Sequence, residues 1–334
     1  MTNGTGYVDE LSYTKLECVT IGIGTIIIGI AGTIGNVLVC SVYSLKSSKT
    51  SSDYFILCLG IVNLSGSMIL VPLEQPLIWF SEDCNNESEI ITALTLFIEM
   101  DSVLSLLNIA LDRYFCICWP HKKIMTPSRS KLMALCALCV AFIGTTVVTI
   151  RERTLEGNLL YSCITMAVLV FTVILYIMVF CRVQTQAAKS ARKRKQTENL
   201  LSTAKDSRNQ HSKQPGSQSK NKKSKMEEMR TKTAYMLIVI TLAYVVSFVP
   251  NATINFIIYV EVQYLLALSG IKAKIVKYLM LLYYLNFDFS PMIYVIMSKK
   301  FRSDVKAFLI KVVPCLASKK SSNEATLLRI TTLK

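Results

Sequence analysis

The sequence predicts an all-α membrane protein, a bundle of seven transmembrane helices with a short interfacial eighth helix. Hydrophobic residues make up 52% of the 334 residues and charged residues only 18%, a composition too apolar for an ordinary soluble domain. Apolar segments also recur at the length of about 20 residues that a helix needs to cross a bilayer. Those segments are 19–45, 54–78, 90–118, 132–150, 160–182, 233–260 and 275–298.

The basic residues predict the orientation of this bundle. Of the 37 Lys and Arg residues, 30 fall in alternate loops and the C-terminal segment, all on one side of the predicted membrane. Because basic residues are retained in cytoplasmic loops, we expect a multi-pass plasma-membrane protein with its N-terminus outside and its C-terminus inside. The net charge of +15 then reflects loops beside an anionic leaflet, and we expect no nucleic-acid partner.

The chain divides around the predicted bundle, 19–298. We expect an extracellular N-terminal tail over 1–18, an interfacial helix over 299–315 and a cytoplasmic tail over 316–334. One loop, 183–230, is long, basic and without aromatic residues, so it cannot bury enough surface to offset the entropy of ordering. We therefore expect this cytoplasmic loop to be largely disordered.

Three positions are candidates for covalent modification. Asn3 and Asn86 begin glycosylation sequons in segments assigned to the outside. Cys315 lies at the end of the interfacial helix, a place beside the membrane that suits S-acylation, and a plain buried thiol is the alternative.

The third predicted helix ends in Asp112-Arg113-Tyr114. A charged Arg113 at a helix end can pair with Asp112 in a resting state and be released toward a cytoplasmic partner, because membrane-buried charge must be compensated. Pro250 and Pro291 each remove a backbone hydrogen bond and so predict kinks about which the last two helices can pivot. Together these features predict a two-state element that a ligand outside can bias.

These residues and their order resemble the rhodopsin-like (class A) G-protein-coupled receptors. The resemblance covers about 30–315 and includes Gly35-Asn36, Ser-Phe-Val-Pro250, Asn286, Ser290-Pro291-Met292-Ile293-Tyr294 and Phe301. It implies an extracellular small-molecule, lipid or peptide ligand, a heterotrimeric G protein and membrane lipids as partners, and no cofactor or metal. It assigns the coupling and switch roles to Asp112, Arg113, Tyr114, Tyr176, Pro250, Pro291 and Tyr294.

The sequence also departs from that family's pattern. Asn63 stands where an aspartate is usual, Ser290 where Asn or Asp is usual, and Phe248 where a tryptophan is usual. A fifth helix without proline, with Val168 at that place, and a very short second extracellular loop are similar to the branch with melanocortin, adenosine and lysolipid receptors.

The family's sodium site is altered by the same substitutions. In the family the cation rests on the helix-2 aspartate, with a helix-3 serine and helix-7 polar groups. Here Asn63 is neutral, Ser102 is retained and Ser290 supplies a hydroxyl. Because a desolvated cation without a carboxylate binds poorly, we expect sodium sensitivity to be lost, unless Glu99, one turn from Ser102, supplies the charge.

The resemblance also implies a disulfide between Cys84 and Cys163, the natural extracellular pair. The fit to the family is imperfect, because Cys84 lies 29 residues before Arg113 and the family spacing is 25, where Ser88 stands. Both a formed bond and two separate thiols remain open at this point.

The ligand pocket is predicted from the phase of helix 3. At about 100° per residue, Thr95, Glu99, Ser102 and Arg113 share one face, so Glu99 points into the bundle while Asp101 faces a neighbouring helix. Intramembrane acids are commonly functional, although a buried structural acid is the alternative for Glu99. We expect the ligand-binding residues to be Thr95, Glu99, Phe248, Asn251, Asn255 and Tyr284.

Other classes of function find less support. Thr95 replaces the aspartate of amine receptors, and Tyr284 replaces the lysine that opsins need for retinal. The sequence has no metal-ligand spacing, phosphate loop or nucleophile set, so we expect no enzyme. A channel or transporter, and a receptor-like protein that does not signal through a G protein, remain the alternatives.

Overall fold

The structure is a computed structural model that describes most of the chain, and its regular elements in that part are all helices. The described residues are 15–70, 89–120, 122–151, 155–205, 232, 235–250, 252–254, 279 and 282–310.

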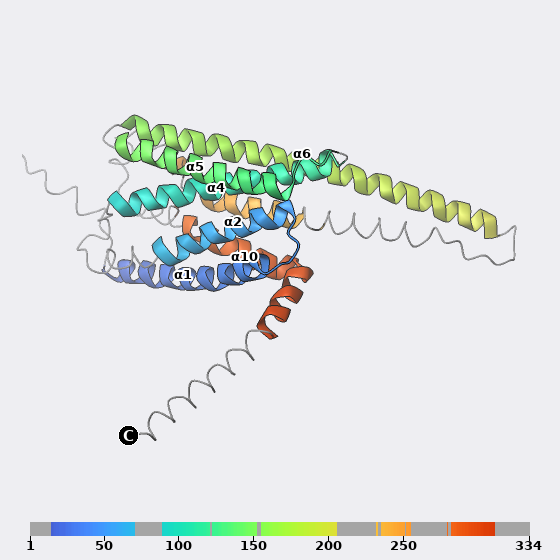
Figure 1. Cartoon of the computed structure of the whole chain (residues 1–334), viewed down its shortest axis with the longest axis horizontal. Coiled ribbons are helices and arrows are strands. Elements are labelled where there is room, and N and C mark those ends of the chain that lie inside the picture. The colour runs from blue at the N-terminus through green and yellow to red at the C-terminus, as the bar shows by residue number, and fades with distance from the viewer. Residues whose placement is uncertain are drawn as a thin grey trace, which may run out of the picture.

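Five long helices lie alongside one another in a single bundle (Figure 1). They are α1 (Lys15–Ser44), α2 (Ser51–Ser65), α4 (Glu89–Cys118), α5 (Pro127–Arg151) and α6 (Leu155–Lys205). Helix α4 packs against α2, α5 and α6, which makes it the central helix of the described part.

Shorter described segments complete the bundle. A π-helical stretch, η2 (Gly66–Leu70), continues α2, and a 3-10 turn, η3 (Leu282–Leu285), leads into α10 (Asn286–Met297). Residues 235–250 and 299–310 are also helical. In Figure 1 the 299–310 helix turns away from the axis of α10.

The fold class expected from the sequence is confirmed. Among the described residues five helices are long and apolar enough to cross a membrane, and each coincides with an expected span. They are Gly22–Ser44, Ala93–Cys118, Pro127–Ile150, Leu159–Gln186 and Tyr235–Ile254. Large apolar side chains are exposed along the outer faces of α1, α5 and α6, for example Ile30, Phe142 and Ile177. Such faces suit hydrocarbon as the surrounding solvent.

Helix α2 begins with a capping box. The Thr50 side chain accepts from the Asp53 N–H, and the Asp53 carboxylate accepts from the Thr50 N–H at 2.7 Å. Lys46 Nζ lies 2.5 Å from the same carboxylate. Burial alone raises the pKa of Asp53, but the hydrogen bonds from Lys46 and Thr50 outweigh it and hold this pKa below its usual value.

Helix α1 packs closely on α10 because small residues face it. The Asn36 side chain donates to the Gly32 carbonyl and to the Phe287 carbonyl, both at 2.8 Å, and so ties the two helices together. A Cβ added to Gly35 would lie 2.7 Å from Pro291. These helices therefore depend on the absence of a side chain at that position.

The expectation of a largely disordered 183–230 loop is wrong for its first part. Helix α6 continues without a break to Lys205 and extends beyond the bundle (Figure 1). Residues 183–205 are rich in Gln, Ala, Lys and Arg and contain no Gly or Pro, so helix propensity carries the helix past the membrane. The remainder of the loop, from 206 onward, lies outside the described residues until Lys232.

The interfacial helix is present over residues 299–310. Its first aromatic residue, Phe301, is buried against Tyr43 and Tyr294, with ring centroids 6.2 and 5.7 Å away. Cys315 and the 316–334 tail lie outside the described residues.

Candidate functional site

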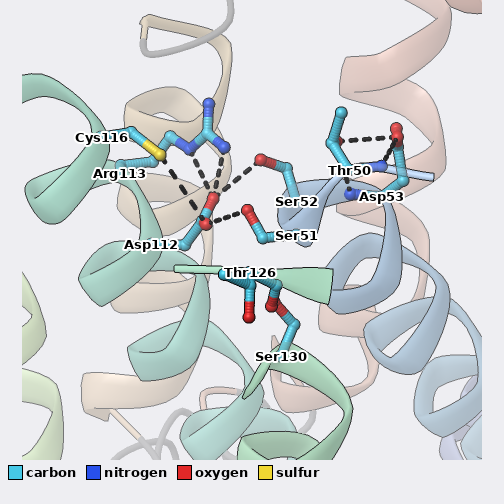
Figure 2. Close-up of polar contacts among 9 residues, drawn as sticks. All are labelled: Thr50, Ser51, Ser52, Asp53, Asp112, Arg113, Cys116, Thr126 and Ser130. Atoms are coloured by element: carbon cyan, nitrogen blue, oxygen red, sulfur yellow. Dashed lines mark hydrogen bonds and ion pairs between the residues drawn. The ribbon is translucent and has the colours of Figure 1, made fainter. Parts of the chain in front are cut away.

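A buried ion pair stands at the end of the bundle where α4 ends and α2 begins, here called the Arg113 end. Arg113 and Asp112 are 7% and 0% exposed, and the Arg113 guanidinium donates to Asp112 Oδ2 through Nε at 3.1 Å and through Nη2. Ser51 donates to Asp112 Oδ1 at 2.5 Å and Ser52 to Oδ2 at 2.7 Å. Figure 2 shows these side chains converging on the carboxylate from α2 and α4.

This arrangement compensates a charge that is costly to bury. The Asp112 carboxylate receives donors on both oxygens, and the Cys116 thiol also lies 4.0 Å from Oδ1. Removing one partner of such a buried pair usually costs about 3–5 kcal/mol, because the other charge is left uncompensated. The pair and its two serine donors therefore hold Arg113 inside the bundle.

Of the other expected switch residues, one besides the adjacent Tyr114 lies near this pair and the rest lie elsewhere in the bundle. Tyr176 of α6 is buried close to Arg113 and Asp112, and Tyr294 of α10 is buried beside Tyr43. Tyr114 is half-buried. Pro291 is buried inside α10, and Pro250 is half-buried at the end of the 235–250 helix.

A second polar cluster lies in the middle of the bundle. The Tyr244 hydroxyl donates to Asn63 Oδ1 at 2.9 Å, which joins the 235–250 helix to α2. The Ser247 hydroxyl donates to Asn286 Oδ1, which joins the same helix to α10. Ser102 and Ser290, the other two positions expected from the altered sodium site, are also buried.

Two further buried acids, Glu99 and Asp101, lie on α4 away from the Arg113 end. Glu99 is 5% exposed and lies near Tyr161 of α6, whose hydroxyl donates to the Leu96 carbonyl at 2.8 Å. Asp101 is equally buried but lies near Cys58 of α2. The two acids therefore face different helices, as the helical phase predicts.

Aromatic side chains lie beside this part of α4. Phe248, Tyr283 and Phe287 belong to one buried cluster with Ile98, and the Phe248 and Tyr283 ring centroids are 6.2 Å apart. Tyr284 is half-buried at the edge of this cluster. Thr95 is half-buried and donates to its own helix at the Ile91 carbonyl. Asn251 and Asn255 lie outside the described residues.

Of the expected disulfide pair, Cys84 lies outside the described residues, so the bond stays a prediction. Cys163 lies within α6, two turns after the helix begins at Leu155, and its side chain is exposed. Asn3 and Asn86 also lie outside the described residues.

Three residues of the site were not found from the sequence. Ser51 and Ser52 contact Asp112 across about 60 residues of chain, and no local pattern indicates that pairing. Tyr244 lies one helical turn before Phe248, so its place on the inward face of that helix was available from the periodicity.

Comparisons with known proteins agree with this geometry. A family model described as "7 transmembrane receptor (rhodopsin family)" matches residues 35–294, most of the chain. The crystal structure of squid rhodopsin is similar to this structure with a TM-score of 0.71, 14% sequence identity, and coverage of 94% of this chain and 91% of that chain. No curated protein sequence matches the chain. The chain belongs to the rhodopsin family of seven-transmembrane receptors and is a multi-pass membrane protein.

Proposed function

We propose that this protein is a plasma-membrane receptor that couples an extracellular ligand to activation of a heterotrimeric G protein. The observation that carries the proposal is the buried Asp112–Arg113 pair, closed by Ser51 and Ser52. A cation held inside one end of a helical bundle is available to a partner once the bundle opens. The Arg113 end is then the cytoplasmic end, in agreement with the distribution of basic residues.

The ligand site in this proposal lies at the opposite end of α4. Glu99 supplies a buried acid beside Tyr161, and Phe248 and Tyr284 supply an apolar wall. A mostly apolar pocket with few polar anchors is typical of small-molecule sites. The Asn63–Tyr244 and Ser247–Asn286 hydrogen bonds lie between this pocket and the Arg113 end, and they provide contacts that a ligand can strengthen or break.

The first test of this function needs no ligand. Asp112→Asn removes the charge that holds Arg113 but keeps an oxygen for the two serines. We expect basal nucleotide exchange on a G protein to rise about tenfold or more, because a charge-assisted hydrogen bond contributes roughly 1.5–3 kcal/mol to the closed state. The measurement is exchange on purified G proteins of several families by the receptor in lipid nanodiscs.

Asp53→Asn is the matched control for this test. Asp53 is also a buried carboxylate at the Arg113 end, but its partners are Lys46 and Thr50. We expect its basal exchange to equal that of the wild type. A rise of the same size in both variants would attribute the effect to general loosening of α2 and would contradict the proposed role of the pair.

A second prediction separates the two buried acids of α4. Glu99→Gln is expected to change ligand affinity or basal exchange more than Asp101→Asn does, because Glu99 lies near Tyr161 of α6 while Asp101 lies near Cys58 of α2. The affinity is measured with an agonist found in a broad ligand screen. Equal effects, or a larger effect at Asp101, would move the ligand site away from Glu99.

A further inference from the structure

A groove lies on the outer face of the bundle between α1 and α10. Its volume is about 360 Å³, and Ala31, Leu38 and Val295 are among the apolar residues that line it. Ile34, Met292 and Ile296 also line it and are 59%, 55% and 69% exposed. In a membrane protein this outer face meets lipid, so the groove opens toward hydrocarbon.

One carboxylic acid lines this otherwise apolar groove. Asp288 of α10 is 6% exposed, and its Oδ1 has no hydrogen-bond partner among the described residues. Gly32 leaves the room for that oxygen, because a Cβ at this position would lie 2.9 Å from it. A buried carboxyl oxygen without a donor is costly, and a buried acid in a membrane commonly has a function.

The depth of Asp288 restricts what can reach it. Ten residues of helix separate it from Ser298, where α10 has ended, which at 1.5 Å per residue is about 15 Å. The hydrocarbon core is about 30 Å thick, so the carboxyl lies near the middle of the bilayer. A group that binds there must arrive through the lipid on an apolar chain.

The opposite end of the groove is basic. Arg302 donates through Nη1 to the Val295 carbonyl at 2.8 Å and to the Ile296 carbonyl at 2.7 Å, and both of these residues line the groove. Lys299 and Lys300 are exposed on the same short helix. An anionic group at the membrane surface is therefore favoured at this end.

We propose that this groove binds a single-chain lipid with an anionic head and a hydroxyl near the middle of its chain, a hydroxylated fatty acid. The head lies beside Arg302, the chain follows the apolar groove and the hydroxyl bonds Asp288. A hydroxyl suits the acid in either protonation state, because it donates to a carboxylate and accepts from a carboxylic acid. An ammonium group would have to lose its hydration in hydrocarbon, which is far more costly.

The test compares two lipids that differ by one oxygen. Stearate hydroxylated at mid-chain and plain stearate are titrated against the full-length receptor in neutral nanodiscs, and binding is measured by native mass spectrometry. We expect the hydroxylated lipid to bind about tenfold more tightly, as one hydrogen bond to a buried acid implies. Equal affinities in the wild type, or no binding of either lipid, would overturn the proposal.

Two variants locate the site. Asp288→Leu is expected to abolish the preference and leave stearate binding unchanged, because it removes the acid and keeps an apolar side chain. Ile34→Phe is expected to weaken both lipids by filling the groove from an exposed position. Ile164→Phe, on the exposed face of α6, is the control and should change neither.

The variants also protect the test against a folding defect. Thermal unfolding of each variant is measured first, and Asp288→Ala, which also removes the acid and leaves a smaller apolar side chain, replaces Asp288→Leu if the latter is unfolded. A tenfold preference that survives in the folded Asp288 variant, or that disappears in Ile164→Phe, would show that the lipid binds elsewhere. Tighter binding of a long-chain amine than of the hydroxylated lipid would also contradict the assignment.

Discussion

Arg113→Ala is expected to abolish G-protein activation, and to do so even when Asp112→Asn has raised the basal level. The guanidinium is buried and held by Asp112, so under the proposed function the pair keeps the cation away from the G protein. Removing the arginine removes the group that the open bundle would present. We expect basal nucleotide exchange of the double variant to fall to that of empty nanodiscs, while surface expression and ligand binding persist.

Arg129→Ala is the matched control for Arg113. Arg129 is an exposed cation at the same end of the bundle, and its Nη1 donates to the Ile124 carbonyl at 2.6 Å. Loss of positive charge at that surface alone should leave exchange within about twofold of wild type, since the interactions of exposed charges contribute little. Exchange that survives Arg113→Ala would refute the coupling role of that side chain.

The sequence predicted the positions of the helices well because length and hydrophobicity alone determine a membrane span. The first and last residues of the helices were predicted less accurately. Helix α5 begins at Pro127, where proline suits the first turn of a helix, and the apolar segment begins only at residue 132. Helix α6 runs to Lys205 because polar residues with high helix propensity continue a helix after the hydrophobic pattern has stopped.

The contacts of the site also divide into those that the sequence predicted and those that it did not. Asp112 and Arg113 are neighbours in the sequence, so their pairing followed from the cost of burying charge. The contacts of Ser51 and Ser52 with that pair depend on how α2 packs against α4, which no local pattern contains. Asp288 is similar, because only the close approach of α1 at Gly32 shows that its carboxyl lies in a groove.

The middle of the bundle leads to a prediction about sodium. Asn63 has no charge to offer, and its Oδ1 already accepts from the Tyr244 hydroxyl at 2.9 Å. A cation there would lose its hydration without gaining a carboxylate, which is unfavourable in a low-dielectric interior. We therefore expect replacement of sodium by a bulky organic cation, at fixed ionic strength, to leave agonist affinity unchanged and to move the unfolding midpoint by less than about 1 °C.

Restoring a carboxylate to the sodium site should restore the response of the receptor's stability to sodium. In Asn63→Asp with Tyr244→Phe, the carboxylate is present and no hydroxyl occupies it, while Ser102 and Ser290 remain. If the Kd for sodium is then about a hundredth of the sodium concentration used, binding adds about 2.7 kcal/mol to the free energy of unfolding. The unfolding midpoint then rises by about 5 °C or more. Tyr244→Phe alone should stay insensitive, because it adds no charge. Asn63→Asp alone should respond less than the double variant, because Tyr244 then donates to the new carboxylate.

A wild-type receptor that loses stability when sodium is removed, with the effect abolished by Glu99→Gln, would contradict this prediction and place the cation one helical turn away, on Glu99.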